Sequence, residues 1–271
     1  MALALAAVLA GAPFARSDDP KPPPRRVVSM NLCTDQLAML LARPGQLVAI
    51  SPIARDPVSS AMWREAETVP IHADSAEAVL GLAPDLVLAG AWDPPATLAL
   101  LRRLGIRVET FPVERSFDDI EANVLRMGDL LGNPDDARRL AEAMRTRLAE
   151  LAPPPEPEPR PRAALYYANG YTSGADTLAD AILAAAGYAN VAAERGIAGL
   201  GSLPLELLVT ERPELLVLGQ DYPTPALAQG ILRHPVLRAL ETRRASVADN
   251  LWVCGTPLAL DAVADLIAAR P

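Results

Sequence analysis

The chain has 271 residues, of which 51% are hydrophobic and 21% are charged, a composition typical of a globular protein rather than a disordered one. Its formal net charge is −8 and its basic residues are scattered among acids, which disfavours nucleic acid as a partner because phosphate binding needs a basic surface. Only two histidines and two cysteines are present, which excludes most dedicated zinc or iron–sulfur sites built from this chain alone.

Residues 1–24 are interpreted as a signal-like segment and leader. A short apolar run ends in the small residues Ala10, Gly11 and Ala12, a pattern typical of a secretory cleavage site, although the positive charge that usually opens such signals is missing. The run is too short to span a bilayer, and the alternative is a disordered, alanine-rich tail. Because a polar, proline-rich stretch follows, we expect an exported, soluble protein. Cys33 does not directly follow the apolar run, which makes it a poor lipoprotein cysteine.

Residues 25–116 are predicted to form an N-terminal α/β lobe. Apolar runs predict strands at 26–30, 47–50, 86–89 and 107–111, with helical patterns between them. Residues 31–33 are interpreted as a loop, and Thr34 or Asp35 is placed to cap the helix that follows. Strands that alternate with helices at this spacing predict a parallel, doubly wound sheet.

The strand signal stops at residue 116. Residues 117–151 predict a helical bridge of two helices divided at Asn133 and Pro134, the second one long, charged and amphipathic. The proline-rich stretch 152–162 predicts a linker or a surface loop. Residues 163–271 predict a C-terminal α/β lobe, with short strands at 246–247 and 251–253. The expected fold class is therefore α/β, with two doubly wound lobes around a central cleft, bridged by one long helix that permits only small hinge motions.

Two stretches of the sequence repeat each other. Residues 77–90 (EAVLGLAPDLVLAG) and 206–219 (ELLVTERPELLVLG) share an acid, a proline seven residues later, an acid after the proline, an apolar run and a glycine. The offset is constant, since 206 − 77 = 129 and 219 − 90 = 129. The repeat predicts two related lobes, and ligands usually bind in clefts between lobes.

Several motifs occur in a fixed order from about residue 25 to the C-terminus. They are RVVSMNLCTDQL, LVAIS, the repeated acid–proline–acid pattern, LGIRVETF and NGYTSGADTLADAILAAAGYANVA. In this order and spacing the chain resembles the periplasmic substrate-binding proteins of ABC importers for vitamin B12 and iron chelates. The resemblance implies two lobes, a long backbone helix, a ligand cleft and little closure.

The resemblance also implies a role for the repeated acids. In this family one surface glutamate on each lobe docks against arginines of the two permease subunits, and Glu77 and Glu206 match those positions. Two similar charges suit a two-fold permease and would steer docking more than supply affinity. The alternative is two ordinary solvated glutamates near helix starts, where the helix dipole favours them.

Ligands of open α/β sheets bind at the carboxyl ends of the strands, so residues after the predicted strands are candidate cleft walls. These candidates are Asn31, Cys33, Thr34, Ile53, Arg55, His72 and Trp92 in the first lobe, and Asn169, Tyr171, Asn250, Trp252 and Cys254 in the second. Trp92 and Tyr171 are expected to be apolar platforms for a flat or bulky ligand. Arg55 either meets an anionic group of the ligand or pairs with Asp56.

Three positions depart from the vitamin B12-binding relatives, which have aromatic residues at or near the places of Ile53, His72 and Leu200. This departure weakens the case for intact cobalamin but not for a metal chelate in general. Cys33 and Cys254 have three interpretations. We expect buried free thiols first, thiolate contacts to a metal in the ligand second, and a disulfide third, since a disulfide would lock the lobes and obstruct the site.

Enzyme motifs such as a nucleophile elbow, a phosphate loop or a dinucleotide fingerprint do not occur in the sequence. His72 and His234 cannot hold a free metal ion by themselves, and His234 is interpreted as structural. A hydrolase or other enzyme using Cys33 and His72 and a ligand-free interaction protein remain as alternatives. We expect a monomeric, non-enzymatic receptor without a metal site or cofactor, which captures a corrinoid, a ferric siderophore or heme and delivers it to an ABC permease dimer.

Overall fold

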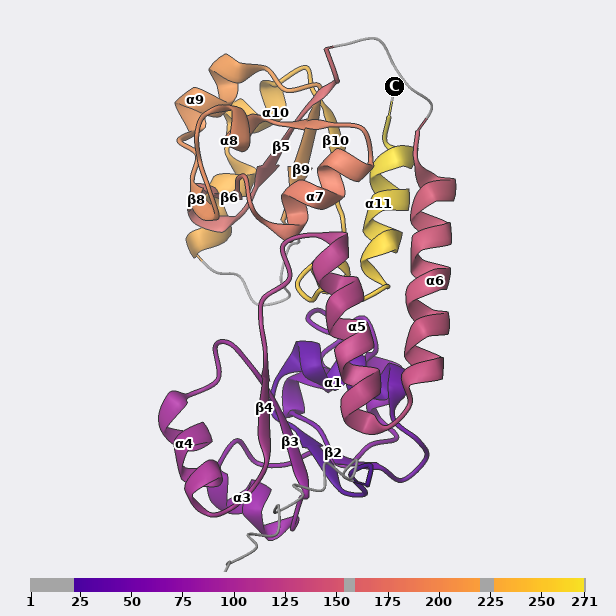
Figure 1. The fold of residues 1–271 in the computed structure, drawn as a ribbon. Coiled ribbons are helices and arrows are strands. Elements are labelled where there is room, and N and C mark those ends of the chain that lie inside the picture. Colours follow the sequence, from indigo (N-terminus) through magenta and orange to yellow (C-terminus); the bar gives the residue numbers. More distant parts are fainter. Residues whose placement is uncertain (1–21, 154–158, 220–226, 271) are drawn as a thin grey trace, which may run out of the picture.

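The computed structural model describes residues 22–153, 159–219 and 227–270 (Figure 1). The predicted export signal, apart from the last residues of its leader, lies outside the described residues, and so does the middle of the proline-rich stretch. What the structure describes is a two-lobed α/β molecule with a parallel sheet in each lobe. The predicted fold class is therefore confirmed.

The first lobe contains a four-stranded parallel sheet with the strand order β2-β1-β3-β4. Its strands are β1 Val27–Ser29, β2 Leu47–Ala49, β3 Leu86–Gly90 and β4 Val108–Phe111. The helices of this lobe are α1 Leu32–Leu41, η1 Pro52–Arg55, α2 Trp63–Ala66, α3 Ala76–Gly81 and α4 Pro95–Arg103. All five residues of β3 are buried, as expected for a central strand that is covered on both faces.

The second lobe contains a four-stranded parallel sheet with the order β10-β9-β5-β7. Its strands are β5 Arg162–Tyr166, β7 Ala189–Asn190, β9 Leu215–Leu218 and β10 Arg243–Ala245. Its helices are η2 Ala168–Gly170, α7 Leu178–Ala185, α8 Val191–Glu194, α9 Leu205–Glu211, η3 Leu227–Arg233, α10 Pro235–Ala239, η4 Asp249–Leu251 and α11 Ala259–Ala268. An antiparallel ribbon of β6 Tyr171–Ser173 and β8 Leu200–Ser202, which the sequence interpretation missed, stands beside this sheet.

The two sheets have the same order once the second is read backwards, with β1 matching β5 and β3 matching β9. The sequence repeat extends to the backbone. Ala83 and Arg212, each just before the repeated proline and 212 − 83 = 129 residues apart, both have a positive φ of 46°. Arg26 and Arg162, the residues at or just before β1 and β5, donate to the carbonyl oxygens of Leu82 and Glu211, which are also 129 residues apart.

The repeated acids after the prolines have matching contacts as well. Asp85 accepts hydrogen bonds from the backbone N–H groups of Arg25 at 2.8 Å and Arg26 at 3.0 Å. Glu214 accepts one from the N–H of Arg162 at 2.7 Å. In each lobe an acid therefore holds the start of a central strand, which explains why the acid follows the proline in both copies of the repeat.

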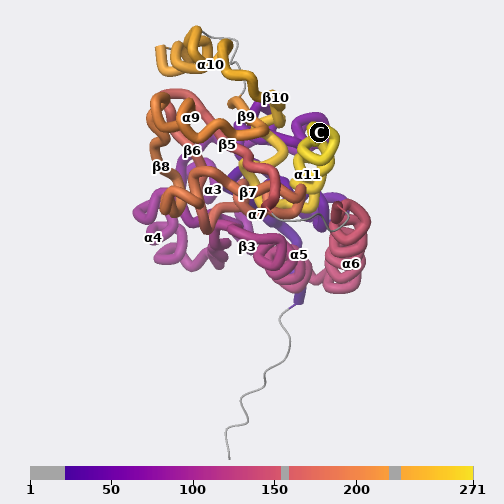
Figure 2. The backbone as a smooth tube through the Cα atoms, turned by 90° about the horizontal axis from the view of Figure 1, so that it is seen from above, coloured from indigo at the N-terminus to yellow at the C-terminus, as the bar shows by residue number. Residues whose placement is uncertain are grey.

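Two helices connect the lobes, as the sequence predicts, with the break at Asn133. They are α5 Phe117–Leu131 and α6 Pro134–Leu151, and the 18 residues of α6 span roughly 27 Å. The helices pack closely where α6 begins, because a β-carbon on Gly128 would lie 2.2 Å from that of Ala137. Figures 1 and 2 both place α5, α6 and α11 along one side of the molecule.

One continuous hydrophobic core runs through both lobes and the bridge. Leu88 of the first sheet, Ile120 and Met144 of the bridging helices, and Leu165 of the second sheet belong to the same cluster of buried side chains. The lobes therefore share their largest core, and each lobe also has smaller buried clusters of its own, around Val87 in the first lobe and Leu216 in the second. A shared core resists large rotations of one lobe against the other, because close-packed interiors deform little.

The structure corrects two local predictions. Helix α1 begins at Leu32, earlier than predicted, because the side chain of Asn31 accepts from the N–H of Cys33 at 3.0 Å and caps the helix in place of Thr34 or Asp35. The strands predicted at 246–247 and 251–253 are wrong. The last described strand is Arg243–Ala245, in register with β9. Residues Asp249–Leu251 form the 3-10 helix η4, and the Trp252 that follows it is buried.

Candidate functional site

A cavity of about 890 Å³ lies between the lobes. Its first wall comes from residues that follow β3 and β4, and its second from residues of the C-terminal lobe. The described lining consists of Trp92, Val113, Glu114, Arg115, Tyr167, Ala168, Ser173, Asp176, Thr177, Leu178, Ala179, Ala198, Gly199, Leu200, Gly219, Leu232, Asp249, Trp252, Val253 and Gly255. Most of this lining is apolar, and both lobes contribute, as expected of a ligand cleft.

Aromatic side chains occupy both the rim and the base of the cavity. Trp92 follows β3 in the first lobe and is 84% exposed, and Leu200 of β8 in the second lobe is 79% exposed. Trp252 is buried, and its ring meets that of Tyr167 edge-on with centroids 6.4 Å apart. Exposed apolar side chains at a cleft rim provide surface that a bulky ligand can bury.

Tyr167 directly follows β5, and the sequence analysis did not include it among the candidate cleft residues. Its position at the carboxyl end of a central strand is the signal that could have identified it. Burial raises the pKa of Tyr167 to about 12, so its phenol is neutral near pH 7. The Ser173 hydroxyl donates to the Tyr167 hydroxyl oxygen at 3.4 Å, which turns the polar end of the ring toward the ribbon.

The charged side chains in the described lining are three carboxylates and one guanidinium: Glu114, Asp176, Asp249 and Arg115. Glu114 is 7% exposed and accepts from the side-chain amide of Asn123 at 2.6 Å. Burial raises the pKa of Glu114, and hydrogen bonds from Asn123 and the backbone of Gly255 oppose the shift. The polar part of the lining is therefore predominantly acidic.

Of the twelve residues that the sequence places at the ligand, Trp92 and Trp252 line this cavity. The others that the structure describes have different contacts or lie outside the lining. Arg55 donates to the carbonyl oxygens of Ala66 at 3.1 Å and Val69 at 2.7 Å, and so holds the loop after α2 instead of pairing with Asp56. Ile53 is 48% exposed and Tyr171 56% exposed, and neither belongs to the lining, nor does Asn169 of η2.

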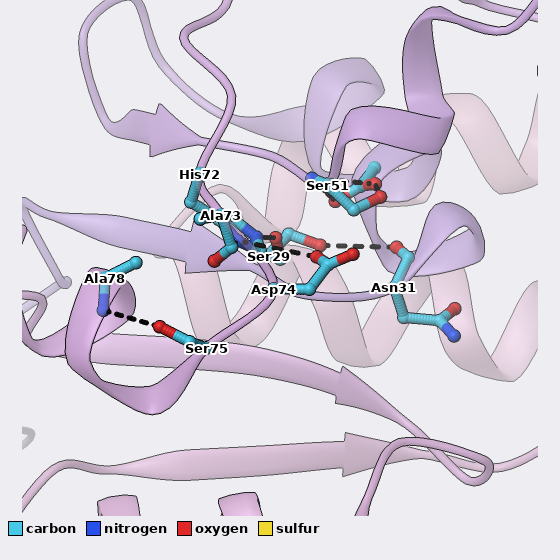
Figure 3. A network of polar contacts seen from close by, with 9 residues as sticks. Ser29, Asn31, Ser51, His72, Ala73, Asp74, Ser75 and Ala78 are labelled. Atoms are coloured by element: carbon cyan, nitrogen blue, oxygen red, sulfur yellow. Dashed lines mark hydrogen bonds and ion pairs between the residues drawn. The ribbon is translucent and has the colours of Figure 1, made fainter.

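A buried polar network at the carboxyl end of the first sheet contains several of the remaining candidates (Figure 3). Thr34 and Ser29 share a hydrogen bond between their hydroxyls at 2.8 Å, and Thr34 also donates to the carbonyl oxygen of Asn31 at 3.0 Å. The ring nitrogens of His72 lie 2.9 Å from the carbonyl oxygen of Ala73 and 2.8 Å from that of Ser29. These side chains support the loops that carry the cleft wall, and they face the interior of the lobe.

Cys33 and Cys254 form a disulfide, which was the third of the three interpretations. The expectation of free thiols is wrong, and so is that of thiolates at a ligand metal. The disulfide joins the first turn of α1 to the segment before α11, and neither cysteine belongs to the cavity lining, so the bond does not obstruct the cavity. Because Cys33 is in a disulfide, it has no thiolate to act as a nucleophile. The alternative of an enzyme that uses Cys33 and His72 is therefore also wrong.

Among the residues that the structure describes, no group of three or more histidine, cysteine, aspartate or glutamate side chains is arranged to hold a metal ion. Within the same ranges, none of the helices has the length and apolar character needed to cross a bilayer.

The family model described as periplasmic binding protein matches residues 27–246, which is most of the chain. The chain belongs to the periplasmic binding protein family. Among curated relatives, the cobalamin-binding protein of Halobacterium salinarum is 31% identical over 199 residues, which cover 72% of this chain and 54% of the relative. The vitamin B12-binding protein of Vibrio cholerae is 30% identical over 131 residues, 48% of this chain and 46% of the relative. This periplasmic binding protein thus spans about half the length of the curated relatives it matches.

Solved structures of the family share the fold. The periplasmic heme-binding protein from Roseiflexus sp. RS-1 superposes with a TM-score of 0.73 at 24% identity, covering 90% of this chain and 97% of that one. The periplasmic vitamin B12-binding protein of Vibrio cholerae gives a TM-score of 0.68 at 20% identity, covering 91% and 96%. At these identities the likeness shows the two-lobed fold, and the ligand has to be inferred from the cavity itself.

Proposed function

We propose that this chain is the substrate-binding component of an ABC importer, which captures a corrinoid or another metal chelate and delivers it to a permease dimer. The observation that carries the proposal is the cavity of about 890 Å³, walled by both lobes and largely apolar. Its volume lies in the upper part of the usual range for ligand pockets, which suits a bulky ligand. The names of the curated relatives, cobalamin-binding and vitamin B12-binding protein, support a corrinoid. The chain works by binding and docking, without catalysis.

The charges of the lining distinguish the candidate ligands. Three acidic residues and one arginine line the cavity, so an anionic ligand meets mostly acidic residues there. Heme carries two propionate groups, whereas the side arms of a corrinoid are mostly uncharged amides. A corrinoid is therefore the favoured ligand, with heme and ferric siderophores as the alternatives. Amide groups can also donate hydrogen bonds to the carboxylates of Glu114 or Asp176.

The test is a titration of the full chain with cyanocobalamin, cobinamide, hemin and a ferric hydroxamate siderophore. Binding is monitored by the change in tryptophan fluorescence. We expect one of the two corrinoids to bind most tightly. Trp92→Ala should raise its Kd by roughly tenfold, because the variant loses an aromatic platform at the rim.

Trp63→Ala is the matched control, since Trp63 lies in α2, stacks with Arg64 and is not part of the lining. Its Kd should equal that of the wild type. If the folded protein binds none of the four compounds, the proposed ligand classes are wrong.

Glu77 and Glu206 are proposed to contact the permease. Both are exposed, in the first turns of α3 and α9. These helices lie at opposite ends of the molecule in Figure 1, one on each lobe. Such an arrangement presents one acid per lobe to a permease with two-fold symmetry. Export to the periplasm belongs to the same proposal, and a mature mass that fits cleavage after Ala12 would support it.

A further inference from the structure

Residues 249–255, here called the wall segment, contribute Asp249, Trp252, Val253 and Gly255 to the cavity lining. In sequence they belong to the second lobe, but several bonds attach them to the first. We propose that the Cys33–Cys254 disulfide positions the wall segment, so that the oxidised chain has a preformed cavity and the reduced chain loses ligand affinity. The part of this inference that concerns affinity rests on the proposed function.

The disulfide is the covalent attachment. It bridges Cα atoms 5.0 Å apart, between the first turn of α1 and the end of the wall segment, and 221 residues separate its two cysteines in sequence. Cys254 is 2% exposed, while Cys33 is partly exposed. Because Val253 and Gly255 flank Cys254 and both line the cavity, a bond at Cys254 fixes the wall on either side of it.

Two non-covalent attachments hold the same segment. The side-chain amide of Asn250 donates to the carbonyl oxygens of Pro57 at 2.9 Å and Ser60 at 3.4 Å, both in the first lobe. Gly255 lies flat against Glu114, where an added β-carbon would be 2.3 Å from the Glu114 Cγ.

The wall segment also contacts the second lobe, through the edge-on packing of Trp252 with Tyr167. It is therefore attached to both lobes at the point where they meet. When the wall segment is ordered before the ligand arrives, binding does not include the entropy cost of ordering it. Preorganisation of this kind increases affinity. When the disulfide is reduced, the hydrogen bonds of Asn250 and the packing at Gly255 remain, and each is weaker than a covalent bond.

The redox step is an ordinary thiol–disulfide exchange. The thiols of Cys33 and Cys254 give up two protons and two electrons, and an oxidised disulfide such as glutathione disulfide takes them up and becomes two thiols. The Cys33–Cys254 bond forms as the bond of the partner disulfide breaks. The wall is then held covalently only in an oxidising compartment, so the tightest ligand binding is confined to chains that have been oxidised.

The experiment compares the oxidised full chain with the Cys33→Ser/Cys254→Ser double variant by amide hydrogen exchange and by titration with cyanocobalamin or cobinamide. In the variant we expect exchange within residues 249–255 to be about tenfold faster and the Kd about tenfold higher, because the wall is no longer preformed. Exchange in the buried strands β1 and β3 reports the loss of global stability, and exchange in residues 249–255 should rise beyond what that loss explains.

Ser75→Ala is the matched control. Ser75 caps α3 by accepting from the N–H of Ala78 at 3.2 Å, so its loss lowers stability without touching the wall segment. In this control, the exchange rates within residues 249–255 and the Kd should both stay at their wild-type values. If the double variant does not fold, Asn250→Ala in the oxidised chain takes its place and should give the same two changes to a smaller extent.

Wild-type exchange rates in residues 249–255 of the folded double variant would overturn the inference. Faster exchange with an unchanged Kd would overturn the link between the wall and affinity. If the wild type binds neither corrinoid, the proposed ligand fails, whereas the exchange measurement still decides whether the disulfide positions the wall.

Discussion

Asp35 is the most deeply buried acid of the first lobe, with no exposed surface. It lies in α1 and accepts hydrogen bonds from the backbone N–H of Ser51, at 3.3 Å, and from the Ser51 hydroxyl. Burial raises its pKa to about 7, and the hydrogen bonds from Ser29 and Ser51 counteract only part of that shift. The sequence suggested Asp35 as a helix cap, because no periodicity distinguishes an acid at a helix start from one that points into the core.

The raised pKa predicts how stability depends on pH. The folded chain binds the Asp35 proton more tightly than the unfolded chain, in which the pKa of Asp35 is near 3.8. Proton binding by Asp35 therefore adds its full contribution to the free energy of unfolding below pH 3.8, and that contribution is lost as the pH rises through about 7. Asp35→Asn should remove this pH-dependent loss of stability. The loss is roughly 4 kcal/mol at most, because the pKa is raised by about three units and each unit corresponds to about 1.4 kcal/mol.

Urea unfolding at about pH 5 and about pH 8.5 measures the effect. The free energy of unfolding should fall with pH more steeply in the wild type than in Asp35→Asn. Asp129→Asn, a change at an exposed position of α5, is the control and should follow the wild type. Equal slopes for the wild type and Asp35→Asn would contradict the prediction.

Among the elements, the repeat was the most informative part of the sequence. It predicted the equivalence of α3–β3 with α9–β9, which the structure confirms down to the positive φ of Ala83 and Arg212. The candidate site was less predictable. Trp92, which follows β3, lines the cavity as the rule of strand ends suggests, whereas Trp252 lines it from the end of η4 and not from the predicted strand. The rule cannot tell that Thr34 and His72 turn toward the interior, because that depends on packing between distant elements. The β6–β8 ribbon was missed because its strands are short and lack alternation.

The next prediction concerns Glu77 and Glu206, in the first turns of α3 and α9. Glu77→Arg and Glu206→Arg, alone and together, should leave ligand affinity unchanged, because both side chains lie outside the cavity lining. Ligand uptake through the permease should fall by roughly tenfold or more in the double variant, because reversed charges repel the arginines expected on the permease.

Glu150→Arg, at an exposed position of α6, is a matched charge reversal away from both helices and should support normal uptake. Transport at the wild-type rate by both single variants and the double variant would leave Glu77 and Glu206 as ordinary solvated glutamates.

At the scale of the whole molecule, three features oppose large movements of the lobes. The hydrophobic core is continuous across them, α5 and α6 run alongside each other between them, and the disulfide joins the first lobe to the wall segment. The sequence predicted the stiffness from the length of α6 alone. The shared core could not be foreseen, because it depends on how α5, α6 and α11 pack together.

These features predict a small response to ligand. The radius of gyration, measured by small-angle X-ray scattering, should change by less than about 1 Å when a corrinoid binds, as in complexes of preorganised proteins. The Cys33→Ser/Cys254→Ser variant should show a larger change, because its wall segment has lost the covalent attachment. Ligand-induced compaction of about 2 Å or more in the oxidised wild type would show that the lobes close by a hinge.

The separation of the two cysteines also has a consequence in time. Cys33 is synthesised 221 residues before Cys254, which at 5 to 20 residues per second is a delay of roughly 10 to 45 s. During that interval the sequence offers Cys33 no other cysteine with which to pair. A nascent chain therefore meets cellular oxidants with a single thiol, and it escapes crosslinking to other proteins only if that thiol remains reduced, or reversibly protected, until the last helix has been made.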